Sequence, residues 1–480
     1  MKTIKRNQEK RRNNERLFEK IKNQAQGITL IALVVTIIVL LILAGVAINL
    51  TVGDNGLFKR AQNAADTWLM AEQNEQSEMD KAADIIDNYI YQSNVEQVVD
   101  SMPGVLETEQ TDPNTYIINS IEDLVFFAYD VREGNYYEGK NVKLGLSLDF
   151  DSNKSYVNAH RTDYEKFGYS GELKATLNKN GFIPIGIMEF INGSEEIDEK
   201  SFKGVFDGDG NKIYNLKIRL EQKTNENQIS MGMFSANNGI IQNLGIENGI
   251  VTSNINLDKF SGISILVGNN RKNGIIRNCY TTGEINCFSS IGYNIGGIAG
   301  ANDGKVYSCY NKANITIYKT TSNLSESLKE CRVGGIIGST ADTSVIENVY
   351  NEGNVMFLSS VTYEMNVNTY LAGLVGLNFG LITNAYSVGK IISQEDQFDD
   401  VYIGNISGRK ASGNVINCYY LPETILTSNT DNIQLRTEGQ ETSEDKMKEE
   451  SFVDLLNNEA NIWKRDIENI NGGYPIFIWQ

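Results

Sequence analysis

Six stretches between residues 231 and 423 repeat one pattern, and this repetition limits the fold more than any other feature of the chain. Each stretch has a short apolar strand containing glycine, then a polar turn, then a second strand ending in Asn or Ser. The stretches are 231–251, 263–285, 295–315, 333–355, 371–391 and 403–423. One such unit cannot bury its apolar face alone, whereas stacked units share a continuous core. The sequence therefore predicts a mainly β fold, a right-handed β-helix or solenoid, with its repeats at 231–424.

Two columns of equivalent residues run through the repeats. The Asn/Ser column is Asn243, Asn278, Ser308, Asn348, Asn384 and Asn417, and the Tyr column is Tyr280, Tyr310, Tyr350, Tyr386 and Tyr419. Like residues in stacked strands form ladders, in which amides bond to amides and rings stack on rings. Cys279, Cys309 and Cys418 share a column with Leu244, Val349 and Ala385. We therefore expect buried small side chains at these cysteines rather than disulfides or reactive thiols, and an odd total of five agrees.

The repeat resembles the GLUG repeat of bacterial surface proteins. The stretch FKGVFDGDGNKIYNLKI at 202–218 is similar to the motif that precedes such repeats, and Trp463 with Tyr474, Pro475 and Ile476 is similar to the end of these domains. The resemblance covers residues 115 to 480. It implies a surface domain and specifies no activity.

The flanks of the repeats carry helical patterns. Ser120 followed by Asp123 resembles a capping box that opens a helix at 119–131, and a second helix is expected at 443–458. Because a solenoid must hide its open edges, we expect these helices to act as caps. Residues 101–115 are predicted to be a linker, 116–230 the N-terminal part of the solenoid with its capping helix and an insertion, and 425–480 a C-terminal cap.

A run of 23 residues without a charge, 28–50, precedes all of this. About 20 apolar residues in a helix cross the hydrocarbon core of a bilayer, so membrane lipid is a predicted partner. Residues 1–27 form a leader with nine Lys/Arg against three acidic residues. Basic flanks stay in the cytoplasm, so we expect a single span with a cytoplasmic N-terminus and an extracellular C-terminal domain. Residues 51–100 keep apolar positions at helical spacing and predict a stalk.

The junction at Gln26-Gly27-Ile28-Thr29, followed by the apolar run, resembles the N-terminus of type IV prepilins of Gram-positive, clostridia-like bacteria. The resemblance implies a prepilin peptidase as a partner, cleavage between Gly27 and Ile28, and N-methylation of Ile28. One departure stands out. The family has a glutamate at the fifth residue of the mature chain, where it pairs with a neighbour's amine during assembly, and this chain has Ala32. Other pilins are therefore expected partners only if the protein enters a filament.

Catalytic groups are sparse. Asp207 and Asp209 form the best carboxylate pair, but their glycines favour a turn over the two-carboxylate site of a glycosidase. Asp149 and Asp151 form only part of a calcium loop. The single histidine, His160, nearly excludes His-based metal sites and Ser/Cys–His catalysis. An aromatic cluster, expected to pack an insertion or to bind sugar or protein, comprises Tyr136, Tyr137, Tyr156, Tyr164, Phe167 and Tyr169.

The sequence predicts display rather than catalysis. Beyond Gly27 the chain holds 34 basic and 58 acidic residues, out of 43 and 61 in the whole chain, so it lacks the basic excess that nucleic-acid binding requires. We expect a prepilin-like, membrane-anchored surface protein that acts in adhesion, with an extracellular glycan or protein ligand, or as a minor part of a pilus-like assembly. We expect no enzyme activity, cofactor or metal. Two alternatives stay open, a β-helix enzyme acting on surface polysaccharide and a passively anchored structural solenoid.

Overall fold

The structure is a computed structural model, and it describes residues 106–109, 112–150, 182–190, 197–220, 230–253, 261–288, 293–319, 330–359, 368–394, 400–427, 433–458 and 460–480. The chain divides into two units, Met1–Asn94 and Val95–Gln480, and the description concerns the second. The predicted leader, membrane span and stalk lie outside the described residues. Within those residues, no helix combines the length and the apolar character that crossing a bilayer requires.

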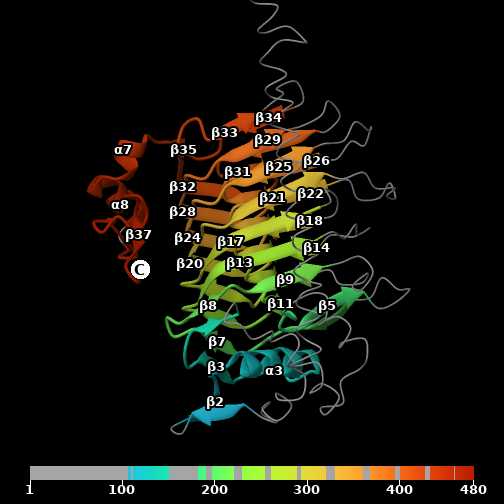
Figure 1. Cartoon of the computed structure of the whole chain (residues 1–480). Coiled ribbons are helices and arrows are strands. Elements are labelled where there is room, and N and C mark those ends of the chain that lie inside the picture. The colour runs from blue at the N-terminus through green and yellow to red at the C-terminus, as the bar shows by residue number, and fades with distance from the viewer. Residues whose placement is uncertain are drawn as a thin grey trace, which may run out of the picture. The chain divides into compact units, whose positions relative to one another are not determined.

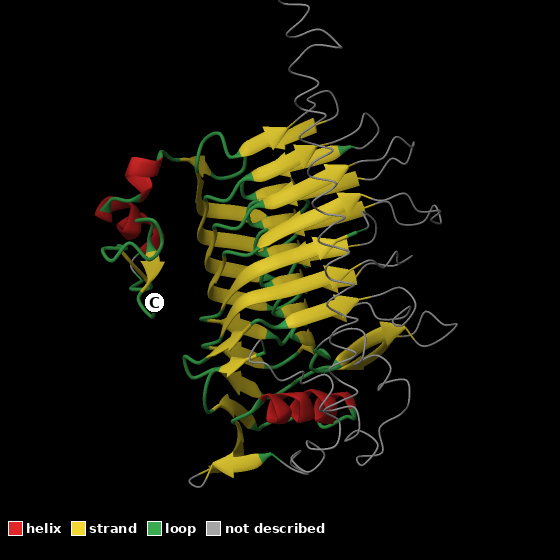
Figure 2. Ribbon diagram, viewed as in Figure 1, coloured by secondary structure: helices red, strands yellow, loops and turns green. Residues whose placement is uncertain are grey.

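The described chain winds through three sheets of stacked strands, as expected for a solenoid (Figures 1 and 2). The seven-stranded sheet consists of β10 (Ser230–Met231), β14 (Ser261–Ile263), β18 (Tyr293–Gly296), β22 (Glu330–Gly334), β26 (Asn368–Ala372), β30 (Val401–Gly404) and β34 (Ile433–Arg436). The six-stranded sheet consists of β11 (Phe234–Asn237), β15 (Val267–Asn270), β19 (Ala299–Asn302), β23 (Ile337–Thr340), β27 (Val375–Asn378) and β31 (Ser407–Lys410).

The third sheet is the largest, with 20 strands in the described residues. Its strands are β1 (Glu107–Glu109), β2 (Asp112–Ile118), β3 (Asn141–Leu144), β4 (Leu148–Asp149), β7 (Val205–Asp207), β8 (Lys212–Tyr214), β9 (Lys217–Leu220), β12 (Ile240–Gln242), β13 (Gly245–Ser253), β16 (Ile275–Arg277), β17 (Tyr280–Cys287), β20 (Lys305–Asn311), β21 (Asn314–Lys319), β24 (Val345–Asn351), β25 (Val355–Ser359), β28 (Leu381–Ser387), β29 (Ile391–Gln394), β32 (Asn414–Tyr420), β33 (Ile425–Thr427) and β35 (Gln440–Glu441).

From β10 to β33, each turn of the solenoid crosses the three sheets in the same order. In one turn, β18 belongs to the seven-stranded sheet, β19 to the six-stranded sheet, and β20 and β21 to the largest sheet. Strands of successive turns pair in parallel and in register, so that Tyr310 of β20 lies opposite Tyr350 of β24. The inward side chains at equivalent positions are branched and apolar, and Val306, Ile346 and Ile382 are fully buried in one continuous core. The inward positions of stacked parallel strands need this composition, because they face only one another.

Helix α3 (Ile121–Arg132) lies at the N-terminal end of the stack, between β2 and β3 in the chain (Figure 1). The Ser120 side chain accepts a hydrogen bond from the backbone of Asp123 at 3.0 Å, which is the N-cap that the sequence indicated. The buried Phe127 of α3 packs edge-on against Phe202, at 5.6 Å between ring centroids. β1 pairs antiparallel with β2 and so covers the first edge of the largest sheet. A short antiparallel pair, β5 (Ile187–Phe190) and β6 (Ile197–Lys200), lies nearby.

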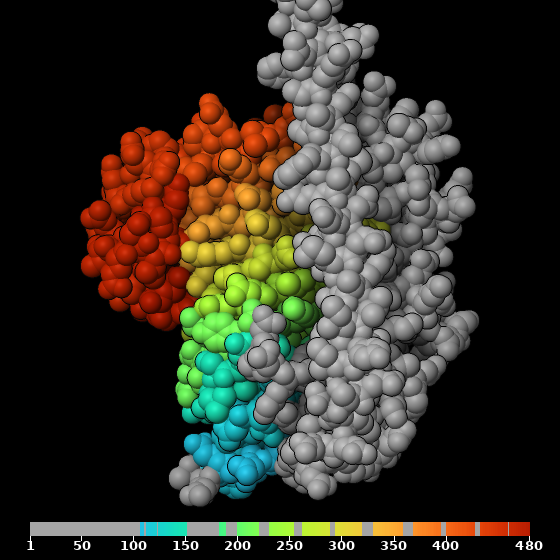
Figure 3. All heavy atoms as spheres, in the orientation of Figure 1, coloured from blue at the N-terminus to red at the C-terminus, as the bar shows by residue number. Residues whose placement is uncertain are grey.

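The C-terminal segment lies beside the stack instead of across its last strands. It contains α7 (Glu444–Met447), α8 (Glu450–Asn457) and the antiparallel pair β36 (Trp463–Lys464) and β37 (Ile476–Phe477). Figure 3 shows this segment, in red, directly against the flank formed by the orange and yellow turns. The helix expected at 443–458 is therefore a cover for the flank. The physical reason is the Tyr column, which leaves an apolar strip on that flank for the segment to bury.

Candidate functional site

The Asn/Ser column marks a bend in every turn. All six residues have φ between 49 and 53°, in the left-handed region that Asn tolerates better than most residues. Amide hydrogen bonds join Asn278 to Asn243 at 3.0 Å and Asn417 to Asn384 at 2.7 Å. Asn348 instead accepts a hydrogen bond from the indole of Trp463 at 2.9 Å. The column therefore sets the corner of the largest sheet, and the amide bonding joins only some of its members.

The Tyr column follows directly after that corner and forms a row of parallel rings. Tyr280 and Tyr310 stack with centroids 4.7 Å apart, Tyr310 and Tyr350 at 4.7 Å, and Tyr350 and Tyr386 at 5.0 Å. Tyr419 lies opposite Tyr386 in the pairing of β28 and β32, and its ring packs edge-on against Phe452 of α8. The row therefore points away from the main core, toward the C-terminal segment.

The C-terminal segment buries the middle of this row in a second, smaller core. Trp463 and Phe477 contact the ring of Tyr350 at 6.0 and 5.4 Å between centroids. The Tyr386 hydroxyl donates to the carbonyl of Pro475 at 2.6 Å. The residues that mark the end of the domain in the sequence, Trp463 and 474–476, are thus those that hold the segment on the solenoid.

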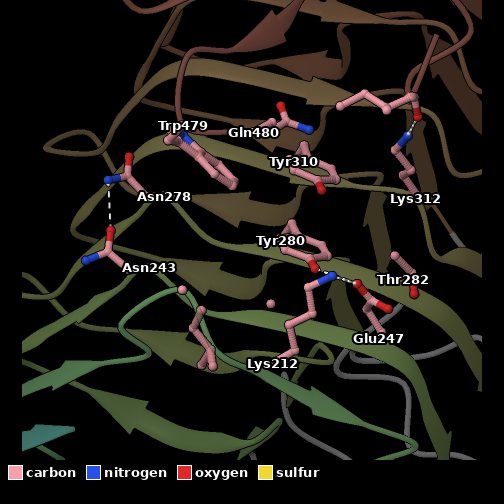
Figure 4. Close-up of a pocket in the computed structure, with 14 residues that line it drawn as sticks. Lys212, Asn243, Glu247, Asn278, Tyr280, Thr282, Tyr310, Lys312, Trp479 and Gln480 are labelled. Carbon is pink, nitrogen blue, oxygen red and sulfur yellow. Dashed lines mark hydrogen bonds and ion pairs between the residues drawn. The ribbon is translucent and has the colours of Figure 1, made fainter. Parts of the chain in front are cut away.

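The C-terminal segment covers the row of tyrosines only as far as Tyr280. At this end, the segment and the solenoid form a groove of about 700 Å³ between them (Figure 4). Its walls come from the corner of β12–β13 and β16–β17 on one side and the last residues of the chain on the other. The lining residues are Gly210, Lys212, Asn243, Leu244, Gly245, Glu247, Asn278, Tyr280, Thr282, Tyr310, Lys312, Ile470, Trp479 and Gln480. Trp479 keeps 37% of its surface exposed and stacks near Tyr310, 6.0 Å between centroids.

A polar cluster lies beside the aromatic wall. Glu247 accepts hydrogen bonds from Lys212 Nζ and from the Tyr280 hydroxyl, each at 2.6 Å on the same Oε1 atom. Partial burial of Glu247 acts to raise its pKa, but these hydrogen bonds outweigh burial and the net pKa is lowered. Burial, followed by the bond to Glu247, raises the pKa of Tyr280. At neutral pH the cluster therefore holds an ionised carboxylate, an ammonium and a neutral phenol.

The ring of Tyr280 can lie against the backbone of the neighbouring strand because residue 245 is a glycine. A Cβ on Gly245 would stand 2.4 Å from two carbons of the Tyr280 ring, closer than atoms approach in a protein. The sequence provides glycine at this place, one strand below the first tyrosine of the row. The groove floor is thus shaped by a residue that has no side chain.

The other sequence candidates have structural roles or lie apart from the groove. Asp207 accepts from Gln242 at 2.6 Å and from Asn243 at 3.0 Å, and Asp209 pairs with Lys143 at 3.0 Å. Both aspartates are therefore engaged in the turn that the sequence favoured. Asp149 accepts from an asparagine amide, while Asp151 and His160 lie outside the described residues. Among the residues that are described, no three potential metal ligands cluster together.

The cysteines and the aromatic cluster are also placed in part. All five cysteines are buried and outside any disulfide, and burial raises the pKa of Cys418 to about 12, which disfavours the reactive thiolate. Tyr137 is buried and donates to Asp130, and Tyr136 lies under Lys203. Tyr156, Tyr164, Phe167 and Tyr169 lie outside the described residues, as do Gly27, Ile28 and Ala32.

Sequence reasoning missed the groove and two buried polar rows. Asn237 donates to Asn270 and Asn270 to Asn302, while Thr281 and Asn351 flank Asn311 in a second row. A signal existed for the second row, because Asn follows Tyr directly in two repeats. The groove had no such signal, since Lys212, Glu247 and Trp479 are far apart in the sequence.

The fold and this groove define a mainly β protein of the solenoid class with a C-terminal segment folded along one flank. No family model and no curated protein matches the chain. A crystal structure from Bacteroides ovatus, described as a candidate immunoglobulin A1 protease, is similar with a TM-score of 0.48 and 19% sequence identity, covering 78% of this chain and 94% of that one. Similarity at this level carries no statement about activity.

Proposed function

We propose that this chain is a cell-surface protein whose solenoid binds an uncharged glycan in the groove beside Tyr280. The observation that supports this function is the pairing of partly exposed aromatic rings with a fixed polar cluster. Trp479 and Tyr280 offer apolar surface, and Lys212, Glu247 and Thr282 offer donors and acceptors. A sugar ring has one face of C–H groups and a rim of hydroxyls, so it can use both at once. Binding pockets generally combine aromatic walls with a few placed polar groups.

The charges in the groove favour an uncharged ligand. Lys212 pairs with Glu247 at 2.6 Å, and Lys312 pairs with Glu352 at 3.1 Å. A charged ligand would have to displace one of these partners. The hydroxyl groups of an uncharged ligand can instead accept hydrogen bonds from the lysines and donate hydrogen bonds to the glutamates while both ion pairs stay in place.

Binding without catalysis is part of the proposal. Most glycoside hydrolases use two carboxyl groups on opposite sides of the sugar bond. Of the described residues that line the groove, one has a carboxylate side chain, Glu247, whose lowered pKa makes it a poor proton donor. The surface-polysaccharide enzyme considered from the sequence gains no support from this geometry, and neither does a solenoid without a ligand.

The prepilin-like and GLUG-like features complete the proposal. The leader, the cleavage between Gly27 and Ile28, the single membrane span of 28–50 and the role of a prepilin peptidase rest on the sequence patterns. They would place the solenoid outside the cell, on a stalk, where a glycan-binding groove is accessible. The GLUG likeness of the repeats agrees with a surface domain.

The test is binding of uncharged oligosaccharides to the full-length protein in detergent, by a glycan array followed by calorimetry. Trp479→Ala should weaken the binding of any positive oligosaccharide at least tenfold, and Ile467→Ala, which changes a more exposed apolar residue outside the groove, should leave it unchanged. Equal affinity of wild type and Trp479→Ala for every bound sugar, or no binding across the array, would overturn the proposal.

A further inference from the structure

Three side chains meet where the C-terminal segment crosses the solenoid, at the end of the groove. Lys312 follows β20, and Glu352 occupies the equivalent place after β24 in the next turn. Lys312 Nζ lies 2.6 Å from Oδ1 of Asn471 and 3.1 Å from Oε2 of Glu352. A primary amine, a carboxamide and a carboxyl group are thus within reach of one another, and the amide comes from a residue 159 positions along the chain.

The amide of Asn471 is fixed in position. Its residue is 2% exposed, its Nδ2 atom donates to the Tyr386 hydroxyl at 2.9 Å, and its backbone N–H donates to Asp466 at 2.7 Å. With Nζ at 2.6 Å from Oδ1, the amine lies at most about 3.8 Å from the amide carbon, because a C=O bond is about 1.2 Å long. Reacting atoms in a productive ground state are held at about 3 to 3.5 Å, so a small movement of the lysine suffices.

Glu352 has the properties of a proton-transfer group. Its Oε1 atom is buried and has no hydrogen-bond partner in the described part of the chain. Burial raises the pKa of Glu352, and the repulsion of Asp466 adds to this, while Lys312 acts to lower it. A carboxyl group with a raised pKa is protonated more easily, so Glu352 can accept a proton from the lysine and later release it.

We propose that Lys312 and Asn471 form an intramolecular isopeptide bond, with Glu352 as the catalytic acid and base. Lys312 passes one proton to Glu352 and becomes a neutral amine. Nζ then attacks Cγ of Asn471 and forms a new C–N bond. The protonated Glu352 supplies the proton that the departing amide nitrogen needs, the Cγ–Nδ2 bond breaks, and ammonia leaves. Nζ gives its second proton to the Glu352 carboxylate, so the new amide keeps one N–H. An amine and a primary amide thus become a secondary amide and ammonia, with no change in oxidation state.

The bond would lie where side chains hold the C-terminal segment on the solenoid. It would join the end of β20 to the loop before β37, and therefore tie the roof of the groove, which carries Trp479, to its floor. Ile470 also lines the groove and its carbonyl accepts from Lys312 at 3.4 Å. A covalent link here would keep the segment in place under mechanical load.

Peptide mapping of the purified full-length protein tests the bond directly. Trypsin does not cut after an acylated lysine, so the linked protein should yield a branched peptide that joins 306–319 to 466–480, lighter than the sum of its two chains by one ammonia. Lys312→Arg and Asn471→Ala should abolish the branched peptide. Glu352→Gln keeps the reactive pair and should reduce the linked fraction at least tenfold. Lys410→Ala, at an exposed lysine of β31, should leave it unchanged.

Wild-type protein decides the question even if a variant fails to fold. A digest of folded wild type that contains free 306–312 and free 466–480, and no branched peptide after prolonged incubation, overturns the proposal. So does conversion of Asn471 to aspartate, which would show that the amide reacts with its own backbone at Asn471-Gly472 instead. Retention of the branched peptide in Lys312→Arg would assign the link to another lysine and overturn it equally.

Discussion

Gly335 leaves the space that the side chain of Asn351 occupies. A Cβ on Gly335 would stand 2.3 Å from Asn351 Cγ and 2.3 Å from the carbonyl oxygen of Gly373 in the next turn. The preceding turn repeats the relationship, since a Cβ on Gly297 would stand 2.2 Å from Asn311 Cγ. The second glycine of the Gly-Gly pair in these repeats is thus explained by a buried asparagine on the opposite wall.

Gly335→Ala should therefore destabilise the solenoid strongly. The obstacle includes backbone, which cannot move aside cheaply, and overpacking of a core costs about 1 to 3 kcal/mol. We expect a loss near 3 kcal/mol in the free energy of unfolding, measured by urea denaturation. Gly139→Ala is the matched control. Gly139 has φ of 72° and nothing within 4 Å, so its loss should come from the left-handed backbone alone, about 1 to 2 kcal/mol. Equal losses would show that space at Gly335 does not matter.

Asn351→Ala should break the buried polar row. Asn351 Oδ1 accepts from Asn311 at 2.9 Å, and Asn351 Nδ2 donates to the carbonyl of Gly353 at 2.8 Å. Removing the amide leaves a buried donor of Asn311 short of one acceptor, which costs about 1 to 3 kcal/mol. Asn273→Ala, in an exposed turn, should change stability by less than about 0.5 kcal/mol. Thermal unfolding of the two variants checks the difference, and similar midpoints would refute the role of the row.

Much of the fold was accessible from the sequence because repeats put the same residue in the same environment several times. The mainly β solenoid that the six repeats predicted is confirmed by the stacked parallel sheets. Equivalent positions such as Tyr310 and Tyr350 lie opposite each other, since in-register stacking turns a sequence period into a contact. The sequence did not predict that the segment 443–480 covers the apolar flank, because this segment occurs once and has no repeat period.

The groove was inaccessible for the same reason. Glu247 sits on β13 and Trp479 at the end of the chain, and only the fold of the C-terminal segment brings them to one place. Single residues outside a repeat give no second copy to compare. The Asn column shows the converse limit. Its positions were visible in the sequence, yet its main role, a left-handed bend at Asn278 and its equivalents, needed the backbone angles.

The Glu247 cluster should make part of the stability depend on acid pH. The pKa of Glu247 is lowered in the folded protein from its usual value of 4.5. The contribution of Glu247 to stability is therefore fully present above pH 4.5, and it is lost as the pH falls through the lower folded pKa. The pair is partly exposed, so we expect less than about 1 kcal/mol between pH 6 and 3. Urea unfolding at both pH values should show this component in wild type and in the exposed control Glu107→Gln. Its persistence in Glu247→Gln would contradict the assignment.

Processing at Gly27 is the prediction that decides the type of anchor. In a bacterium with a prepilin peptidase, the N-terminal peptide of the membrane-bound protein should begin at N-methylated Ile28. Gly27→Leu should leave the leader, residues 1–27, attached to the protein, because the variant lacks the small residue before the cleavage site. Gly45→Leu changes another glycine of the apolar run and should still be processed. Mass spectrometry of that peptide checks all three, and an uncut wild-type chain would rule the processing out.

Ala32 should keep the processed protein from entering filaments efficiently. During assembly the new amine of Ile28 would enter an apolar helix bundle, and an unpaired buried charge there costs several kcal/mol. A glutamate in place of Ala32 would supply the missing partner, whereas a methyl group cannot. We therefore expect sheared surface filaments to contain little wild-type protein, several-fold more Ala32→Glu, and no more Ala32→Gln than wild type, because glutamine matches the size of glutamate without its charge. Immunoblots of sheared and membrane fractions compare the three, and abundant wild-type protein in filaments would show that assembly uses another partner for the amine.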